Sequence, residues 1–480
     1  MTWRTVIGLE IHAQLSTRTK AFCACSTRFG DLPNRNTCPV CLGMPGALPV
    51  LNHEAVDLAV KAALSLHCQV RQVSVFARKN YFYPDLPKGY QITQYDRPLA
   101  EHGTIEAPMA DGALRRIRIR RVHMEEDAGK SIHLPRGGDT LVDFNRCGVP
   151  LVEIVTEPDI TSPEEAAACL KELRDVLRFI DACDGNMEQG SFRCDANVSV
   201  MREGDSVLGT RTELKNLNSF RFVQRGLEHE VQRHVALLES GIPVVQETRL
   251  FDSRTGLTHP MRSKEEAHDY RYFPEPDLQP LVVDSEWTAR AAAALPPVPA
   301  DFRRRMMEEY GLPFYDAEVL SATRDVAEYA LAVLASGCDP KLASNWLMTE
   351  VLAVLKSTRS TAGQFPVAPS DVAGLVRLLS EQKLSVPLAK EVFARMWSER
   401  VGLAQCIRSV GTQVNDEDAL VAVCRSVVDN APAEVAKYLA GKTQIVSWFV
   451  GQAMGRTRGT GNPRMLTRIF TDLLEGRKNP

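Results

Sequence analysis

Acidic and imidazole side chains alternate with apolar ones along a short segment near the N-terminus. Between residues 6 and 15, apolar side chains occupy one set of alternate positions, and Gly8, Glu10, His12 and Gln14 occupy the other. This alternation predicts a β-strand with one apolar and one polar face. Carboxylate oxygens and an imidazole nitrogen on the same face can bind a metal ion.

Two further segments, 192–200 and 211–215, show the same alternation and are expected to form strands. Their polar positions are Arg193, Asp195, Asn197 and Ser199 in the first segment and Arg211, Glu213 and Lys215 in the second. An antiparallel sheet with one solvated face would produce this pattern too, so alternation alone does not decide between a site and a solvated face. The mixture of His, Asp, Asn, Glu and Arg differs from the Lys and Glu that dominate plain solvent-exposed faces.

Two groups of carboxylates favour a metal site over a solvated face. Glu153 stands in the apolar run 151–155, where an unpaired charge would be costly, and the acidic cluster 123–127 follows a basic strand. Carboxylates gathered on one sheet face repel one another unless cations hold them, and Mg²⁺ prefers oxygen ligands. We therefore predict a Mg·ATP site with His12 as a nitrogen ligand. Its expected carboxylates are Glu10, Glu125, Glu126, Glu153, Asp195 and Glu213.

No standard nucleotide-binding motif accompanies these carboxylates. Residues 127–131 end like a phosphate-binding P-loop, but the glycine that opens that motif is missing. A Rossmann glycine motif is also absent from the sequence. An ATP site in this chain is therefore expected to be built from a sheet and metal ions, with Arg or Lys side chains completing it.

Four of the twelve cysteines lie close together in the sequence, at Cys23, Cys25, Cys38 and Cys41. Two close pairs of thiolates match tetrahedral zinc, and a closed four-sulfur site is structural. The alternative is a set of buried free thiols, because cysteine behaves as a small hydrophobic residue. The other eight cysteines lack such spacing and are expected in the core, which is typical of a reduced cytoplasmic protein.

Cations and aromatic residues are interleaved between residues 78 and 91. Such a segment can stack on a base or a terminal ribose and neutralise phosphates, with Lys79, Tyr81 and Tyr83 as the contacts. A packed loop with aromatic core residues is the equal alternative. In the similar segment 269–277, packing is the preferred interpretation of the aromatic side chains.

Positive charge gathers near the C-terminus. Residues 440–480 carry seven cations and two acids in a chain whose net charge is −3. Glycines flank Arg456 and Arg458, so the backbone there can approach phosphates closely. We predict RNA contacts through these two arginines, and the alternative is a basic helix end beside a flexible loop.

The elements that position these residues are expected to form a sheet-rich part followed by helices, which gives the fold class α+β. The first part has short alternating runs broken by Gly and Pro, which is typical of antiparallel strands and turns. Helices within it are expected at 53–66, 162–181 and 219–240. After a proline-rich linker at 295–299 the apolar spacing becomes helical. The predicted domains are 1–294, 295–405 and 406–480. No signal peptide and no membrane span are expected.

Several of these segments resemble motifs of the GatB/GatE family of tRNA-dependent amidotransferase subunits, and the resemblance runs from residue 6 to about residue 470. The segments that carry it are Val6–His12, Arg78–Asp85, His123–Lys130, Arg193–Asn197, Glu213–Ser219 and Asp269–Asp277. The tail departs from the family pattern at Gly455, where a lysine is usual, and at Gly461, where an alanine is usual. GatE relatives carry an additional inserted domain, for which 480 residues leave no room.

The resemblance implies an ATP-dependent ligase within a cytoplasmic heterotrimer that also contains the subunits GatA and GatC. A GatB-type subunit phosphorylates the Glu side chain on mischarged glutamine tRNA, or the Asp side chain on mischarged asparagine tRNA. Ammonia that GatA releases from glutamine then displaces the phosphate. The implied architecture is a glutamine-synthetase-like cradle domain, a helical domain and a tRNA-binding tail domain. Only some members have the four-cysteine zinc site.

Roles of individual residues follow from the resemblance and from the strand geometry. The resemblance places magnesium ligands at His12, Glu126 and Glu153, with Glu10 and Glu125 beside them, and these five are the expected catalytic residues. The ATP contacts expected from the strands are Arg193, Asp195, Asn197, Glu213 and Lys215.

Two other functions compete with this interpretation. A non-catalytic tRNA-binding scaffold with structural zinc would explain the cysteines and the basic tail, but not the carboxylates near the strand centres. A two-metal hydrolase would cleave phosphate or ester bonds without glutamine or ammonia. The sequence leaves open whether Glu-tRNA, Asp-tRNA or both are substrates, and which carboxylates bind each metal ion.

Overall fold

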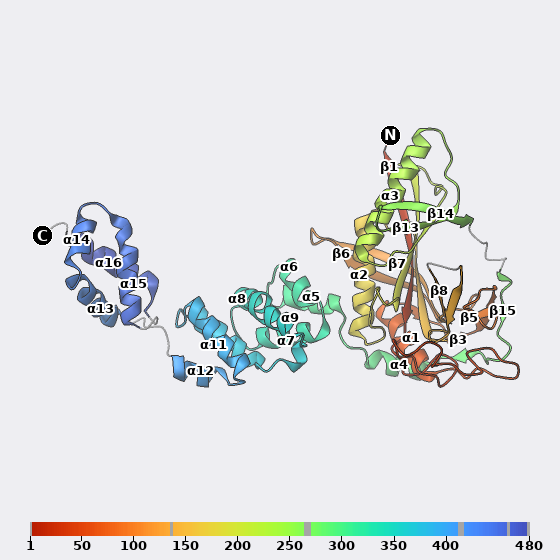
Figure 1. Cartoon of the computed structure of the whole chain (residues 1–480), viewed down its shortest axis with the longest axis horizontal. Coiled ribbons are helices and arrows are strands. Elements are labelled where there is room, and N and C mark those ends of the chain that lie inside the picture. The colour runs from red at the N-terminus through yellow and green to blue at the C-terminus, as the bar shows by residue number, and fades with distance from the viewer. Residues whose placement is uncertain (1, 135–137, 264–269, 411–416, 458–460, 478–480) are drawn as a thin grey trace. The chain divides into compact units, whose positions relative to one another are not determined.

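The computed structural model describes residues 2–134, 138–263, 270–410, 417–457 and 461–477 (Figure 1). Two units can be distinguished, residues 1–300 and residues 301–480, and each is described by itself. The first unit contains the strands and the second is helical. The predicted α+β class is therefore confirmed, whereas the three-domain division with boundaries at residues 294 and 405 stays a prediction.

A nine-stranded sheet forms the centre of the first unit. Its order is β14 (Leu257–Ser263), β13 (Glu247–Asp252), β12 (Thr212–Lys215), β11 (Phe192–Arg202), β1 (Trp3–Gln14), β10 (Pro150–Thr156), β7 (Leu114–Glu126), β6 (Ala100–Pro108) and β2 (Gln69–Val70). The expected antiparallel pairing is confirmed with one exception, because β12 and β13 are parallel. The helix α3 (Phe220–Glu239) connects these two strands, and a crossover helix allows parallel neighbours.

The apolar face of the sheet is covered by α3 and by α2 (Pro163–Phe179), which lie beside it in Figure 1. The apolar residues of β1, from Ile7 to Ala13, are buried in one core with Leu173 and Leu177 of α2. Ser162 caps α2 and Ser219 caps α3, each by accepting a hydrogen bond from a backbone N–H of the first turn. Both predicted helices are confirmed, and the opposite face of β1 is left to the polar side chains.

Smaller elements surround the main sheet. The helix α1 (His53–Ser65), which the sequence also predicted, contacts α4 (Ser285–Ala293). A three-stranded sheet of β15 (Phe273–Pro274), β4 (Phe76–Asn80) and β5 (Tyr90–Gln94) packs through β5 against β7. The remaining pairs are β16 (Leu281–Val282) with β3 (Val73–Ser74), and β8 (Lys130–His133) with β9 (Thr140–Asp143).

The described part of the second unit is built from helices. They are α5 (Pro299–Glu308), α6 (Phe314–Leu320), α7 (Arg324–Ala335), α8 (Pro340–Trp346), a π-helix (Leu347–Val351), α9 (Leu352–Thr358), α10 (Pro369–Ser380), α11 (Val386–Ser398), α12 (Leu403–Val410), α13 (Glu417–Asp429), α14 (Pro432–Leu439), α15 (Val446–Arg456) and α16 (Pro463–Glu475), with 3₁₀ turns at Ala362–Gln364 and Thr443–Ile445. The last four helices bury a core of their own around Phe449 and Phe470. None of the helices described in the chain has both the length and the apolar character needed to cross a membrane.

Candidate metal centre

Polar side chains of four strands meet on the face of the sheet that points away from α2 and α3. His12 of β1 lies opposite Glu153 of β10, and Glu153 lies opposite His123 of β7. In the adjoining row, Glu10 lies opposite Asp195 of β11. Because side chains of paired residues in neighbouring strands share a face, the sheet register itself brings these residues together. The polar face predicted for residues 6–15 is thus the floor of a carboxylate and imidazole centre.

Glu153 occupies the middle of this centre. Its Oε2 atom lies 3.3 Å from Nε2 of His12 and 3.3 Å from Nε2 of His123. His12 Nε2 is also 3.5 Å from Oε1 of Glu125 and 3.9 Å from Oε1 of Glu10. Two groups of ligand atoms result, Glu10–His12–Glu153 and His123–Glu125–Glu153, and within each group the atoms lie within 4.8 Å of one another.

The charges of the centre shift its pKa values in opposite directions. Burial raises the pKa of Glu10, and the neighbouring Glu153 carboxylate raises it further. Burial also works against ionisation of Glu153, but the charges of His123 and His12 and their hydrogen bonds hold its pKa well below the ordinary value. Burial opposes protonation of His12, yet its hydrogen bond to Glu153 and the surrounding carboxylates raise its pKa to about 9. Without a metal ion, a proton on His12 therefore balances the carboxylates.

The donor set fits divalent cations. Carboxylate oxygens are the ligands that Mg²⁺ prefers, and an imidazole nitrogen can join them when it is neutral. His123 Nδ1 is buried and has no hydrogen-bond partner among the described atoms, so this nitrogen is available to a ligand. Glu153 belongs to both groups of ligand atoms, which would let one carboxylate serve two neighbouring ions. The identity of any bound ion stays a prediction.

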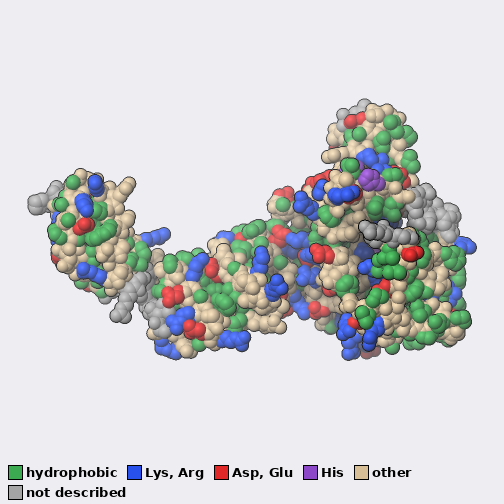
Figure 2. Space-filling model, viewed as in Figure 1, with side chains coloured by type: hydrophobic (Ala, Val, Ile, Leu, Met, Phe, Trp, Pro, Cys, Tyr) green, Lys and Arg blue, Asp and Glu red, His purple; other side chains and the backbone are tan. Residues whose placement is uncertain are grey.

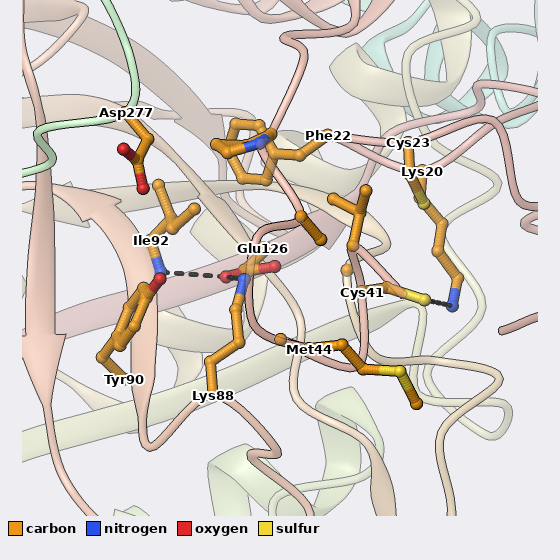
Figure 3. Close-up of a pocket in the computed structure, with 15 residues that line it drawn as sticks. Lys20, Phe22, Cys23, Cys41, Met44, Lys88, Tyr90, Ile92, Glu126 and Asp277 are labelled. Atoms are coloured by element: carbon orange, nitrogen blue, oxygen red, sulfur yellow. Dashed lines mark hydrogen bonds and ion pairs between the residues drawn. The ribbon is translucent and has the colours of Figure 1, made fainter. Parts of the chain in front are cut away.

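Glu125 and Glu126 point in different directions although they are adjacent. Glu125 faces His12 and accepts a hydrogen bond from Thr93 Oγ1 at 3.3 Å. Glu126 forms an ion pair with Lys88 and accepts a hydrogen bond from the backbone N–H of Ile92 at 3.0 Å, as Figure 3 shows. Glu126 belongs to neither group of ligand atoms found among the described residues. Its expected role as a magnesium ligand stays a prediction that this arrangement does not support.

Glu126 instead borders a cavity of about 120 Å³ next to the cysteine loop. Lys88 and Tyr90 line it from one side, and Cys23 and Cys41 line it from the other (Figure 3). Lys88 is almost completely buried, and its pairing with Glu126 outweighs the effect of burial and raises its pKa. The two predicted sites, one of carboxylates and one of thiols, are therefore separated by this cavity and its ion pair.

The residues expected to contact ATP extend the centre across β11 and β12. Lys215 Nζ lies 2.5 Å from Asp195 and 3.4 Å from Glu213. Arg193 donates to Asp127 at 3.0 Å, and Asn197 lies opposite Glu213 in the sheet register. These side chains therefore lie on one strip of the polar face, where cations already have carboxylate partners.

An aromatic group stands beside the carboxylates, on the three-stranded sheet and its flanks. Tyr81 lies 6.0 Å from Tyr270, and Tyr272 is stacked on Tyr95 with ring centroids 4.1 Å apart. Lys79 Nζ lies 4.8 Å from the ring centroid of Tyr270. Burial raises the pKa of Tyr272, and the Glu153 and Glu125 charges raise it further, so this hydroxyl lies close to the centre. These contacts fit the interpretation that the aromatic side chains of segment 269–277 serve packing. The packed group also flanks the carboxylate centre.

Among the five residues expected to contact RNA, Tyr83 and Arg456 are exposed. The side chain of Tyr83 is exposed, and Arg456 donates to Ser426 Oγ at 2.6 Å. Arg458 lies outside the described residues. Figure 2 shows Lys and Arg interspersed with Asp and Glu over the visible face of the helical unit. RNA binding by this face would therefore depend on local cations and not on a broad field of one sign.

The four clustered cysteines meet in the loop between β1 and α1. The Sγ atoms of Cys23, Cys25, Cys38 and Cys41 all lie within 4.8 Å of one another. Tetrahedral zinc with bonds of about 2.3 Å needs its sulfur ligands to be this close. A hydrogen bond from Cys23 lowers the pKa of Cys41 to about 4, although burial opposes this, so one thiolate is already favoured without a metal ion. All twelve cysteines are free, and the cluster is compatible with structural zinc.

Sequence reasoning did not assign His123, Thr93, Asp127 or Lys88 to the site. His123 and Glu125 are two positions apart in β7, so alternation within that strand was the signal that could have paired them. Thr93 lies in β5 and Lys88 lies in the turn before it, and no local pattern encodes how this segment packs against β7. Asp127, which binds Arg193 and Gln14, follows β7 and was visible only as part of an acidic run.

Comparisons with known proteins extend over nearly the whole chain. Residues 5–289 match the family model described as the GatB/GatE catalytic domain, and residues 328–474 match the model described as the GatB domain. A protein of Thermodesulfovibrio yellowstonii is 48% identical over 476 residues, which cover 99% of this chain and 100% of the relative. A protein of Halorhodospira halophila is 51% identical over 478 residues, with the same shares. A protein of Solidesulfovibrio magneticus is 50% identical over 469 residues, or 98% of each chain. The names of all three describe the B subunit of an aspartyl/glutamyl-tRNA(Asn/Gln) amidotransferase.

Proposed function

The chain belongs to the GatB/GatE family of tRNA amidotransferase subunits, and from this premise we propose that it activates the side-chain carboxylate of an amino acid carried by tRNA. The substrates are Glu on glutamine tRNA, Asp on asparagine tRNA, or both, in line with the names of the relatives. The observation that carries the proposal is the centre around Glu153, where two imidazoles contact one carboxylate oxygen and the carboxylates of Glu10 and Glu125 lie close by. ATP is the proposed phosphoryl donor.

The chemistry has two steps that together replace a carboxylate oxygen by nitrogen. An oxygen of the substrate carboxylate attacks the γ-phosphorus of ATP, the bond to the bridging oxygen breaks, and ADP leaves. Ammonia then attacks the carbonyl carbon of the acyl phosphate and inorganic phosphate leaves. Magnesium would offset the repulsion between the carboxylate and the triphosphate and neutralise charge on the phosphoryl oxygens.

In this proposal different residues of the chain bind the cations and the triphosphate. Glu10, His12 and Glu153 would hold one cation, and His123 and Glu125 would hold a second together with Glu153. The strip of Arg193, Asp195, Asn197, Glu213 and Lys215 would bind the triphosphate, with Lys215 and Arg193 exchanging their carboxylate partners for phosphate oxygens. Glu126, paired with Lys88, would shape the wall of the neighbouring cavity.

Ammonia requires a source, and we propose that a glutaminase subunit of the GatA type supplies it within a complex that also contains a GatC-type subunit. The sequence shows no serine–lysine amidase signature of its own. The setting proposed is the cytoplasm, where the twelve free cysteines would stay reduced.

We further propose that Lys79, Tyr81 and Tyr83 contact the acceptor end of the tRNA, and that Arg456, with Arg458, contacts its backbone. Tyr81 belongs to the aromatic group beside Glu153 and Lys79 lies against it, so a base stacked there would bring the esterified amino acid to the centre. The cysteine cluster is proposed to bind zinc as a structural ion, because four thiols in one small loop satisfy its tetrahedral preference.

Glu10→Ala tests the proposed function in the purified complex. Label transferred from the γ-phosphate of ATP to Glu-tRNA or Asp-tRNA is measured without glutamine, and tRNA binding is measured in parallel. We expect the label transfer to be lost while tRNA binding persists. Full label transfer by the Glu10→Ala complex with normal tRNA binding would favour a non-catalytic scaffold and refute the proposed role of this strand.

A further inference from the structure

Lys20 is completely buried beside the cysteine cluster, which is rare for a charged side chain. Its Nζ donates to the backbone oxygen of Asn36 at 2.6 Å and to that of Phe144 at 3.2 Å. The third partner is Cys41 Sγ at 3.6 Å, the contact drawn between Lys20 and Cys41 in Figure 3. The ammonium group therefore uses its three donors on two carbonyl groups and one sulfur atom.

A buried ammonium ion is costly unless a negative charge lies close to it. Among the described residues no carboxylate forms an ion pair with Lys20, whereas Lys88, the other buried lysine of this cavity, is paired with Glu126. Carbonyl oxygens provide only partial charge. The one partner of Lys20 that can carry a full negative charge is the sulfur of Cys41.

The cysteine cluster, in contrast, would carry an excess of negative charge when it holds a metal ion. Four thiolates around one divalent ion leave a net charge of about −2, in a loop that is partly buried. A cation in contact with one sulfur lowers the energy of that charge, and partners of metal ligands commonly set how firmly a metal is held. Lys20 is positioned to be such a partner, because its ammonium lies against Cys41.

Packing around Lys20 keeps the charge at this place. Gly148 has a φ of +84°, and a β-carbon at this position would lie 3.4 Å from Cδ of Lys20 and 3.5 Å from Cβ of Cys41. The N–H of Ala21 donates to the Gly148 oxygen at 2.8 Å, which fixes the backbone next to Lys20. The stem of the lysine therefore runs in a narrow passage that leads its ammonium group to the cluster.

We propose that Lys20 is the buried counter-charge of the cysteine cluster and that its positive charge governs how long the cluster retains its metal ion. The inference rests on the proposed zinc site and adds a residue outside the four ligands. The competing explanation is that Lys20 only joins two loops through the Asn36 and Phe144 carbonyls. In that case its hydrogen bonds matter and its charge does not.

Two substitutions separate charge from hydrogen bonding. Lys20→Gln keeps N–H donors for the carbonyl groups but removes the charge, and Lys20→Arg keeps the charge. Lys61→Met is the matched control, since Lys61 is a partly buried lysine of α1 that pairs with Asp57 away from the cluster. The full chain is purified in its complex, its zinc content is measured by elemental analysis, and zinc release to a colorimetric chelator is followed over time.

We expect Lys20→Gln to release zinc about 10- to 100-fold faster than the parent chain, as is common for lost partners of metal ligands. Lys20→Arg and Lys61→Met should stay within a few-fold of the parent rate. A folded Lys20→Gln chain that releases zinc at the parent rate overturns the proposal. If Lys20→Gln does not fold, zinc release from a folded Lys20→Arg chain decides between charge and hydrogen bonding. Rapid zinc loss from the Lys20→Arg chain contradicts the role of charge. A parent chain that contains no zinc after growth with zinc refutes the zinc site itself, which is a distinct outcome.

Discussion

Glu153 Oε2 lies 3.3 Å from Nε2 of His12, the residue directly opposite it in the sheet. The same oxygen lies 3.3 Å from Nε2 of His123 on the other neighbouring strand. One carboxylate therefore bridges two imidazoles across three strands. In the absence of metal ions such a bridge is held by protons, and divalent cations would compete with those protons for the same atoms.

The pH dependence of magnesium binding should reflect His12. Because its pKa in the metal-free protein is about 9, His12 is largely protonated at pH 7.5 and must lose that proton to bind a cation. We expect binding to release about one proton at pH 7.5, and affinity to rise with pH until it levels off above pH 9. Calorimetry in two buffers of different ionisation enthalpy measures the release, with His12→Asn as the control that should abolish it. Identical heats in both buffers would contradict the assignment.

The aromatic group beside the centre should contribute to binding of the tRNA substrate and not to binding of ATP. Tyr81→Leu keeps side-chain bulk but removes the ring, and a lost base stack costs about 1–3 kcal/mol. We expect the KM for aminoacyl-tRNA to rise about tenfold or more, with the KM for ATP nearly unchanged. Tyr315→Leu, at an exposed position of α6, is the control. A rise confined to the KM for ATP would assign Tyr81 to the nucleotide.

The cysteine cluster should hold its loop together only as a set of four. Cys25→Ser removes one thiolate and should reduce bound zinc to well below one ion per chain and lower the Tm of the protein. Cys338→Ser changes a cysteine of the helical unit outside the cluster and should leave both quantities unchanged. Elemental analysis and thermal unfolding test this. Full zinc content in the Cys25→Ser chain would show that the ion binds elsewhere.

Arg456 in the C-terminal tail is predicted to contribute to tRNA binding through its charge. Arg456→Ala should weaken tRNA binding several-fold and reduce by about one the slope of log affinity against log salt, because one phosphate contact is lost. Lys383→Ala removes a cation just beyond α10 that pairs with Glu381 and should change neither value. Titrations of the complex with tRNA at several salt concentrations provide the slopes. An unchanged slope for Arg456→Ala would remove this arginine from the RNA-binding surface.

How far the sequence predicts this site depends on the range of each interaction. The polar face of Glu10 and His12 follows from alternation, a property of one strand, and its prediction needs no partner. The pairing of Glu153 with His123 depends on the register of strands that are distant in sequence, and no local pattern sets it. Glu126 pairs with Lys88 and the Ile92 amide because β5 and the turn before it pack against β7, and no local pattern encodes that contact. The parallel pair β12–β13 likewise depends on where α3 returns the chain.

Glu153→Gln tests whether the carboxylate of Glu153 organises the proposed phosphoryl-transfer centre. This change preserves shape but removes the charge between the two imidazoles. The control is Glu157→Gln, at a position just beyond the same strand where the carboxylate pairs with Arg120 near the surface. In the purified complex, ADP formation that depends on Glu-tRNA or Asp-tRNA is measured without glutamine. We expect ADP formation to fall about 100-fold or more in Glu153→Gln with normal tRNA binding, and to change little in Glu157→Gln. ADP formation at the parent rate by a folded, tRNA-binding Glu153→Gln complex would contradict this role of Glu153.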